Sequence, residues 1–235
     1  MVEAGIICPE KSDFNYCRDI FGLNKIGEIA KRKVGIRELD SVKIIAVNAG
    51  TGKINCASTT QMLIDRYDLD VVVDSGRAGG LREEFNIPTV VAGLKSFEYD
   101  IIQDKELDKI SGKHISETMV ACLDNTSVDE FRKEKEYNNI VCGNIACGEK
   151  NVNNSIMRDL LFMKLNAFAC NRETSAVIKT AFYNDIPSLS FRVITNYADA
   201  NSKDDDYKYK KEGLEYLYEI IGKFLTSEYG LNLFE

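Results

Sequence analysis

The chain has 235 residues, of which 44% are hydrophobic, enough for a sizeable core in one large domain. Its formal net charge of −7 disfavours nonspecific binding to nucleic acid or to an anionic membrane. No apolar run approaches the roughly 20 residues that a membrane-spanning helix needs, and the first residues lack the basic start and apolar middle of a signal peptide.

Cysteine and histidine usage further limits the chemistry. The seven cysteines are scattered, without a CxxC or a paired Cys/His spacing, so we expect reduced thiols in a cytoplasmic protein and neither disulfides nor a zinc site. The single histidine, His114, lies in a polar stretch and is expected at the surface. A histidine-based triad or metal centre is therefore disfavoured.

The order of apolar and polar segments is typical of an α/β protein. Apolar runs bounded by turn residues predict strands at 4–8, 34–39, 42–47, 71–73, 89–93, 119–123, 140–143, 167–170 and 188–194. Helices are expected after Pro9 and over 54–67, 128–135, 153–164, 176–185 and 214–225. The polar, lysine- and aspartate-rich segment 200–213 is expected to be a loop. This alternation of strands and helices favours a mostly parallel or mixed sheet.

Residues 69–81, LDVVVDSGRAGGL, join a β-branched run to a glycine-rich segment. The run predicts a strand buried on both faces that ends in a sharp turn over 74–80. Ligands bind at the carboxyl ends of strands in open α/β sheets, and glycine lets a backbone approach a ligand closely. Taken alone, the stretch fits a binding site and an ordinary tight turn equally well.

A second glycine-containing loop, NAGTGK at 48–53, lies between a predicted strand and a predicted helix. Together with the next strand these elements make a βαβ unit. GTGK is similar to part of a phosphate loop but lacks the GxxxxGK[ST] spacing. The loop therefore gives little support to a nucleoside triphosphatase.

Five segments in order carry a more specific signal: GII near the start, AGTGKINCA, DVVVDSGRAGGL, the RET segment and FRVITNYAD. This set resembles the nucleoside phosphorylase/hydrolase family, and within it the 5′-methylthioadenosine/S-adenosylhomocysteine nucleosidase branch. The resemblance implies a single three-layer αβα domain over 1–235 with a central mixed, twisted sheet. It implies cleavage of a purine nucleoside at its N-glycosidic bond, without a cofactor or metal, by a homodimer active in nucleoside metabolism such as methionine salvage.

The resemblance also assigns roles to three charged residues. Glu173 matches the glutamate that clasps the ribose 2′- and 3′-hydroxyls, although a glutamate at a helix start can simply face the helix dipole. Arg192 matches the arginine beside the nucleophile, although it could instead pair with a core carboxylate for structure. Asp13 lies where the nucleosidases carry a glutamate that orients or deprotonates the attacking water. A solvent-facing or helix-capping aspartate is the alternative.

Other positions depart from the nucleosidase pattern. Asn196 replaces the aspartate that protonates the purine N7; an amide can donate a hydrogen bond but cannot deliver a proton. Some related purine nucleoside phosphorylases use asparagine for 6-oxopurines, so Asn196 indicates inosine- or guanosine-like substrates, or else reduced or lost activity. Asp199 is a substitute acid at an unsuitable spacing.

Substrate contacts are expected from further residues of the same segments. Arg77 replaces a small residue of the family SAGG turn and could bind phosphate, bind an anionic substrate group or fill the pocket. Arg172 replaces a methionine that packs on the ribose, and Gly79 lies in the glycine turn. Ala146 and Cys147 align with the purine-stacking loop, which here lacks its aromatic residue.

Three functions fit these residues. The first is a purine nucleosidase that uses water. The second is a phosphorylase in which Arg77, Arg192 and Lys11 hold a phosphate dianion. The third is a non-catalytic nucleoside-binding protein that has kept the fold.

Overall fold

The computed structural model describes residues 1–101, 116–119, 125–135 and 137–233. The strands in these ranges are β1 (Val2–Cys8), β2 (Lys25–Ile29), β3 (Arg32–Glu38), β4 (Val42–Asn48), β5 (Val71–Gly80), β6 (Thr89–Glu98), β7 (Ser116–Met119), β8 (Ile140–Cys147), β9 (Ala167–Asn171) and β10 (Ser188–Asn196). The helices are α1 (Lys11–Phe21), α2 (Lys53–Ile64), α3 (Asn125–Glu134), α4 (Ser155–Leu165), α5 (Thr174–Tyr183), α6 (Ser202–Leu225) and α7 (Glu228–Leu231). His114 and most of the predicted strand 119–123 lie outside the described residues.

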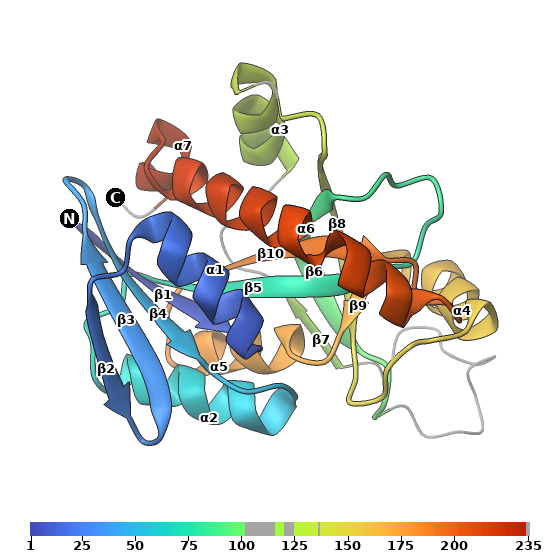
Figure 1. The fold of residues 1–235 in the computed structure, drawn as a ribbon, viewed down its shortest axis with the longest axis horizontal. Helices are drawn as coiled ribbons and strands as arrows, with labels where there is room; N and C mark the ends of the chain where they lie inside the picture. The colour runs from blue at the N-terminus through green and yellow to red at the C-terminus, as the bar shows by residue number, and fades with distance from the viewer. Residues whose placement is uncertain (102–115, 120–124, 136, 234–235) are drawn as a thin grey trace.

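The strands form one mixed sheet between two layers of helices, which confirms the predicted three-layer αβα class. Helices α1, α6 and α7 lie on one face, and α2 and α5 pack side by side on the other (Figure 1). Apolar side chains of α6 and of the central strands form one buried cluster. A second cluster joins α2 and α5 to the opposite side of the sheet. Within the described ranges, no helix has the length and apolar character to cross a membrane.

Five strands of the sheet close into a ring. β5 pairs with β10, β10 with β6, β6 with β8, β8 with β9, and β9 returns to β5. In this register Gly79 of β5 is opposite both Cys170 of β9 and Asn196 of β10. Closure of the ring therefore gathers residues from three distant segments at one end of the strands.

The predicted sharp turn over 74–80 is wrong, because β5 continues through these residues to Gly80. Pairing with β10 extends the strand as far as Gly79. Gly76 has a positive φ of 133°, and a Cβ there would lie 3.0 Å from Arg192 Nη1 and 3.1 Å from Asp13 Oδ2. A glycine at this point lets the strand bend while two charged side chains approach its backbone.

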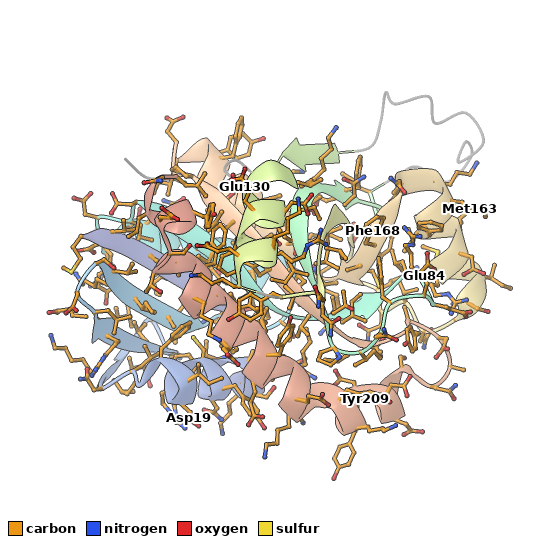
Figure 2. The ribbon with its side chains drawn as sticks, turned by 90° about the horizontal axis from the view of Figure 1, so that it is seen from above. Asp19, Glu84, Glu130, Met163, Phe168 and Tyr209 are labelled. Atoms are coloured by element: carbon orange, nitrogen blue, oxygen red, sulfur yellow. The ribbon has the colours of Figure 1, made fainter. Side chains whose placement is uncertain are left out.

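The predicted loop over 200–213 is also wrong, since α6 begins at Ser202 and runs through this segment. Tyr209 lies on that half of the helix (Figure 2). Acidic residues fill the first turn and lysines follow, which suits the helix dipole. Strand β2 pairs with β3 at the edge of the sheet, and its side chains are almost all exposed. It was not predicted because it lacks a buried apolar face.

Candidate functional site

A cleft of about 260 Å³ opens where β5, β9 and β10 end. The predicted site residues that line it are Arg77, Gly79, Arg172, Glu173 and Asn196. Asp13 and Arg192 are buried directly behind this lining and contact it. The topology therefore brings together the charged residues that the sequence placed far apart.

Arg192 is held inside the sheet by a buried carboxylate. Its Nε lies 2.9 Å from Asp74 Oδ2, and its Nη2 pairs with Asp74 Oδ1. The same aspartate accepts hydrogen bonds from the hydroxyls of Ser190 and Thr174, each at 2.7 Å. Burial alone would disfavour the charge, but the neighbouring carboxylates raise the pKa of Arg192 and keep it cationic.

Glu173 lies beside this guanidinium, with its Oε2 3.5 Å from Arg192 Nη1. Its side chain makes no capping bond to its own helix. Instead it accepts hydrogen bonds from the backbone N–H groups of Gly52 at 3.1 Å and Arg172 at 3.2 Å. Glu173 thus presents a fixed carboxylate at the cleft wall, next to a cation.

Asp13 joins the first turn of α1 to the same site. Asp13 forms a capping box with Glu10, whose backbone N–H donates to Asp13 Oδ2 at 3.3 Å. The helix-capping interpretation is therefore correct, but capping is not the only contact of Asp13 in the described structure. The other oxygen, Oδ1, accepts from Arg77 Nε at 3.1 Å. Burial raises the pKa of Asp13 to about 6, and the nearby Arg77 charge opposes that rise. A carboxylate with this pKa can take up a proton near neutral pH.

Arg77 is surrounded by carboxylates from two helices. Besides Asp13, its guanidinium pairs with Glu10 at the start of α1 and with Asp206 of α6. Asp206 is fixed in turn by the Thr195 hydroxyl, 2.6 Å away. Arg77 therefore closes one side of the cleft and carries no uncompensated positive charge.

Asn196 ends β10 and lines the cleft opposite Gly79 in the strand register. Its Oδ1 accepts from the backbone N–H of Ala198 at 3.0 Å. Its Nδ2 makes no hydrogen bond to any residue that the structure describes. The Asn196 amide can therefore offer N–H donors to a ligand.

The apolar part of the lining differs from the sequence expectation. Tyr99, Val152 and Cys170 belong to one cluster at the cleft. Ala146 and Cys147, which align with the purine-stacking loop, are fully buried and do not line it. Burial raises the pKa of the Cys147 and Cys170 thiols to about 12, so both are neutral and poor nucleophiles.

Four contributing residues were missed: Glu10, Asp74, Tyr99 and Asp206. Asp74 had a signal, because an arginine inside an apolar strand requires a buried partner and Asp74 directly follows another apolar run. Glu10, Tyr99 and Asp206 join the site through contacts between segments far apart in the chain, which no local sequence pattern shows. Among the described residues, no group of His, Cys, Asp and Glu is arranged to hold a metal ion.

A model of the phosphorylase superfamily matches residues 16–224, nearly the whole length of α1 to α6. The chain belongs to this superfamily. A 5′-methylthioadenosine/S-adenosylhomocysteine nucleosidase of Mycobacterium bovis is 25% identical over 224 residues, covering 86% of this chain and 88% of the relative. These findings confirm the family resemblance that the ordered motifs indicated.

Solved structures of superfamily members share the fold. One is a Helicobacter pylori nucleosidase, an aspartate-to-asparagine variant with 5′-methylthioadenosine in its active site. It has a TM-score of 0.85 at 18% identity and covers 95% of this chain and 97% of that one. The futalosine hydrolase of the same species has a TM-score of 0.84 at 18% identity, covering 94% and 96%.

Proposed function

We propose that this superfamily member hydrolyses the N-glycosidic bond of a purine nucleoside. One observation carries the proposal: Glu173 and Arg192 lie 3.5 Å apart at a cleft that also contains Asn196. The first step is binding of the ribose diol by Glu173, whose oxygens can accept both hydroxyl protons. Its negative charge then stabilises the positive charge that develops on the sugar as the bond to the base breaks.

Asp13 activates the attacking water. Its ionised carboxylate accepts a proton from a water that attacks C1′, and a pKa of about 6 suits this exchange. Arg77 holds the carboxylate at 3.1 Å, and Arg192 lies behind Glu173. The water oxygen bonds to C1′ as the bond to the base breaks, and the base leaves with the bonding electron pair. The proton taken up by Asp13 then returns through solvent to the base, so the products are free ribose and a neutral purine.

The leaving base is stabilised by Asn196. Because Asn196 Oδ1 already accepts a hydrogen bond from the Ala198 N–H, the Asn196 amide presents its own N–H donors to the base. A 6-oxopurine presents two acceptors on this edge, N7 and O6, whereas adenine presents one acceptor and one donor. Asn196 therefore favours hypoxanthine or guanine nucleosides over adenine nucleosides.

Water is favoured over phosphate as the nucleophile. The candidate phosphate ligands Arg77 and Arg192 both have carboxylate partners. The third candidate, Lys11, is exposed and does not line the cleft. A phosphate dianion would have to displace carboxylates that are already in contact with both guanidinium groups.

A product assay in phosphate-free buffer tests the proposal. Inosine should yield hypoxanthine and free ribose, at a rate that added phosphate leaves unchanged. Formation of ribose 1-phosphate only when phosphate is added would support the phosphorylase alternative. Binding of inosine and adenosine without base release would support the non-catalytic nucleoside-binding alternative.

We also propose that the chain is a single-domain protein that acts as a homodimer in cytoplasmic nucleoside metabolism. The layer of α2 and α5 exposes the apolar side chains of Ile54, Phe182 and Tyr183, which a second copy could cover. Light scattering of the purified chain would measure its mass. A role in methionine salvage requires 5′-methylthio nucleosides as substrates. Whether the cleft favours such substrates depends on the residues that surround the 5′ group.

A further inference from the structure

The cleft lining has an apolar part and a polar part. Tyr99, Val152 and Cys170 form the apolar part and belong to one hydrophobic cluster. The rest of the lining, apart from the ribose clasp and Asn196, contains mostly charged and polar residues, namely Glu10, Arg77, Lys150, Asn151, Asn153, Arg172, Ser202, Lys203 and Asp206. Among the described residues, the part of the lining contributed by Glu10, β5 and the start of α6 has no apolar side chain larger than that of Ala78.

The proposed function fixes how a nucleoside lies in the cleft. Asn196 holds the base beside the apolar cluster, because Asn196 Oδ1 and Cys170 Sγ each lie 3.1 Å from the position of a Cβ built on Gly79. Glu173 holds the diol. The 5′-carbon is attached to C4′, on the same face of the sugar as the base but across the ring oxygen from it, so its substituent extends away from the base. The described residues left to receive its substituent form a charged wall, namely Glu10, Arg77, Arg172, Ser202, Lys203 and Asp206.

We propose that this charged wall is a subsite for a hydrogen-bonding 5′ group, and that the substrate is a ribonucleoside with a free 5′-hydroxyl rather than a 5′-alkylthio nucleoside. The inference rests on the proposed function for the orientation of the ligand. An alkylthio group against this wall would remove water from charged side chains and return no hydrogen bonds. A hydroxyl can donate to the Glu10 or Asp206 carboxylate and accept from Lys203.

The wall is not a general anion site. Arg77, its most enclosed cation, already contacts Glu10, Asp13 and Asp206. A 5′-phosphate placed there would face two carboxylates at the cleft surface, Glu10 and Asp206. The wall therefore selects a neutral polar group over both an apolar and a doubly charged one.

Matched substrate pairs test this selection independently of the base. We expect kcat/KM for inosine to exceed that for 5′-methylthioinosine by about tenfold or more, and kcat/KM for adenosine to exceed that for 5′-methylthioadenosine in the same way. The methylthio group finds no apolar surface to pack against at the wall, and it also removes water from the charged side chains. Equal or higher values for the methylthio compounds would overturn the subsite. Faster cleavage of inosine 5′-monophosphate would overturn its neutral character.

A matched pair of variants locates the effect. Arg172→Met keeps the backbone N–H that binds Glu173 and replaces a charged side chain with an apolar one. We expect it to raise the methylthio-to-hydroxy ratio of kcat/KM by about threefold to tenfold. Lys150→Met changes a lining residue outside the charged wall, whose carbonyl accepts from the hydroxyl of Tyr99 in the apolar cluster, and should leave that ratio unchanged. Equal shifts in both variants would contradict a localised subsite.

Calorimetric titration of the same pairs separates the subsite from the reaction. If no nucleoside is cleaved but inosine still binds more tightly than 5′-methylthioinosine, the hydrolase proposal fails and the subsite stands. If cleavage occurs but the methylthio compounds bind equally well or better, the subsite fails and the hydrolase proposal stands.

Discussion

Arg192 and Arg77 both lie against carboxylates, but their surroundings differ. Arg192 is buried within the sheet, and its main partner, Asp74, projects from the neighbouring strand. Arg77 lines the cleft, and its partners Glu10, Asp13 and Asp206 come from two helices on one face of the sheet. The pairing of β5 with β10 thus positions the partner of Arg192. Arg77 instead connects the start of α1 to α6, which meet only when the helices pack on the sheet.

This difference separates stability from specificity. A buried charge that loses its partner stays buried, so changes at the Arg192 pair should act mainly on folding. Charges at the cleft surface can be rehydrated, so changes around Arg77 should act mainly on the cleft. The predictions below begin with the largest expected effect.

Replacement of Asp74 with alanine should destabilise the fold most. Among the described residues, the variant Asp74→Ala leaves Arg192 with Glu173 as its one carboxylate partner, and we expect the free energy of unfolding to fall by about 3–5 kcal/mol. Urea denaturation measures the change. The control Glu10→Ala removes a partly exposed partner of Arg77 together with half of the α1 capping box, and should cost only about 1 kcal/mol. Similar costs for both would show that the two guanidinium sites are not different.

Replacement of Glu173 with glutamine should remove most of the activity and destabilise the fold less than Asp74→Ala, because Arg192 keeps both contacts with Asp74. Glutamine keeps an acceptor for the Gly52 N–H but loses the charge beside the developing cation, so kcat should fall about 10²–10³-fold. Steady-state rates with inosine measure this, and thermal unfolding provides the control. Undiminished turnover would remove Glu173 from the site.

Exchange of Asn196 for aspartate should change the choice of base. The new carboxyl can deliver a proton to N7, so the ratio of kcat/KM for adenosine to that for inosine should rise about tenfold. Competition between the two nucleosides in one reaction measures the ratio. An unchanged ratio would refute the account of leaving-group activation.

The pH dependence should report on Asp13. Its carboxyl must be ionised to accept a proton from water, so kcat/KM should rise with pH through about 6. Because Arg77 lowers the pKa of Asp13, the variant Arg77→Met should move this limb to higher pH. A limb that does not move would show that Arg77 leaves Asp13 unaffected.

The same pKa shift has a consequence for folding. The folded chain binds this proton more tightly than the unfolded chain, so the contribution of Asp13 to stability falls as pH rises from 3.8 to about 6. Urea denaturation at several pH values measures this contribution. The variant Asp13→Asn, which cannot titrate, is the control and should lack this component.

Much of the fold was predictable from local pattern. Apolar runs located the strands that are buried on both faces, and the strand–loop–helix order gave the layers. The end of β5 was not predictable, because pairing with β10 extends a glycine-containing segment that resembles a turn by composition. The first half of α6 was missed because a run of Asp and Lys lacks the apolar spacing on which helix prediction depends.

The site was predictable where the residues themselves carry the chemistry. Glu173 and Asn196 follow predicted strands, and both line the cleft. The partners of Arg77 could not be predicted, because Glu10 and Asp206 are separated from it by 67 and 129 positions along the chain. Contacts of that kind arise only when α1 and α6 pack on the same face of the sheet.

A crystal structure of the Glu173→Gln variant soaked with inosine tests the central claim most directly. The account predicts the ribose diol at residue 173, the purine N7 within hydrogen-bond distance of Asn196 Nδ2, and C1′ facing Asp13 across one water. Inosine bound outside this cleft, or bound in it with the base beside Arg77 and the sugar beside Tyr99, would contradict the account.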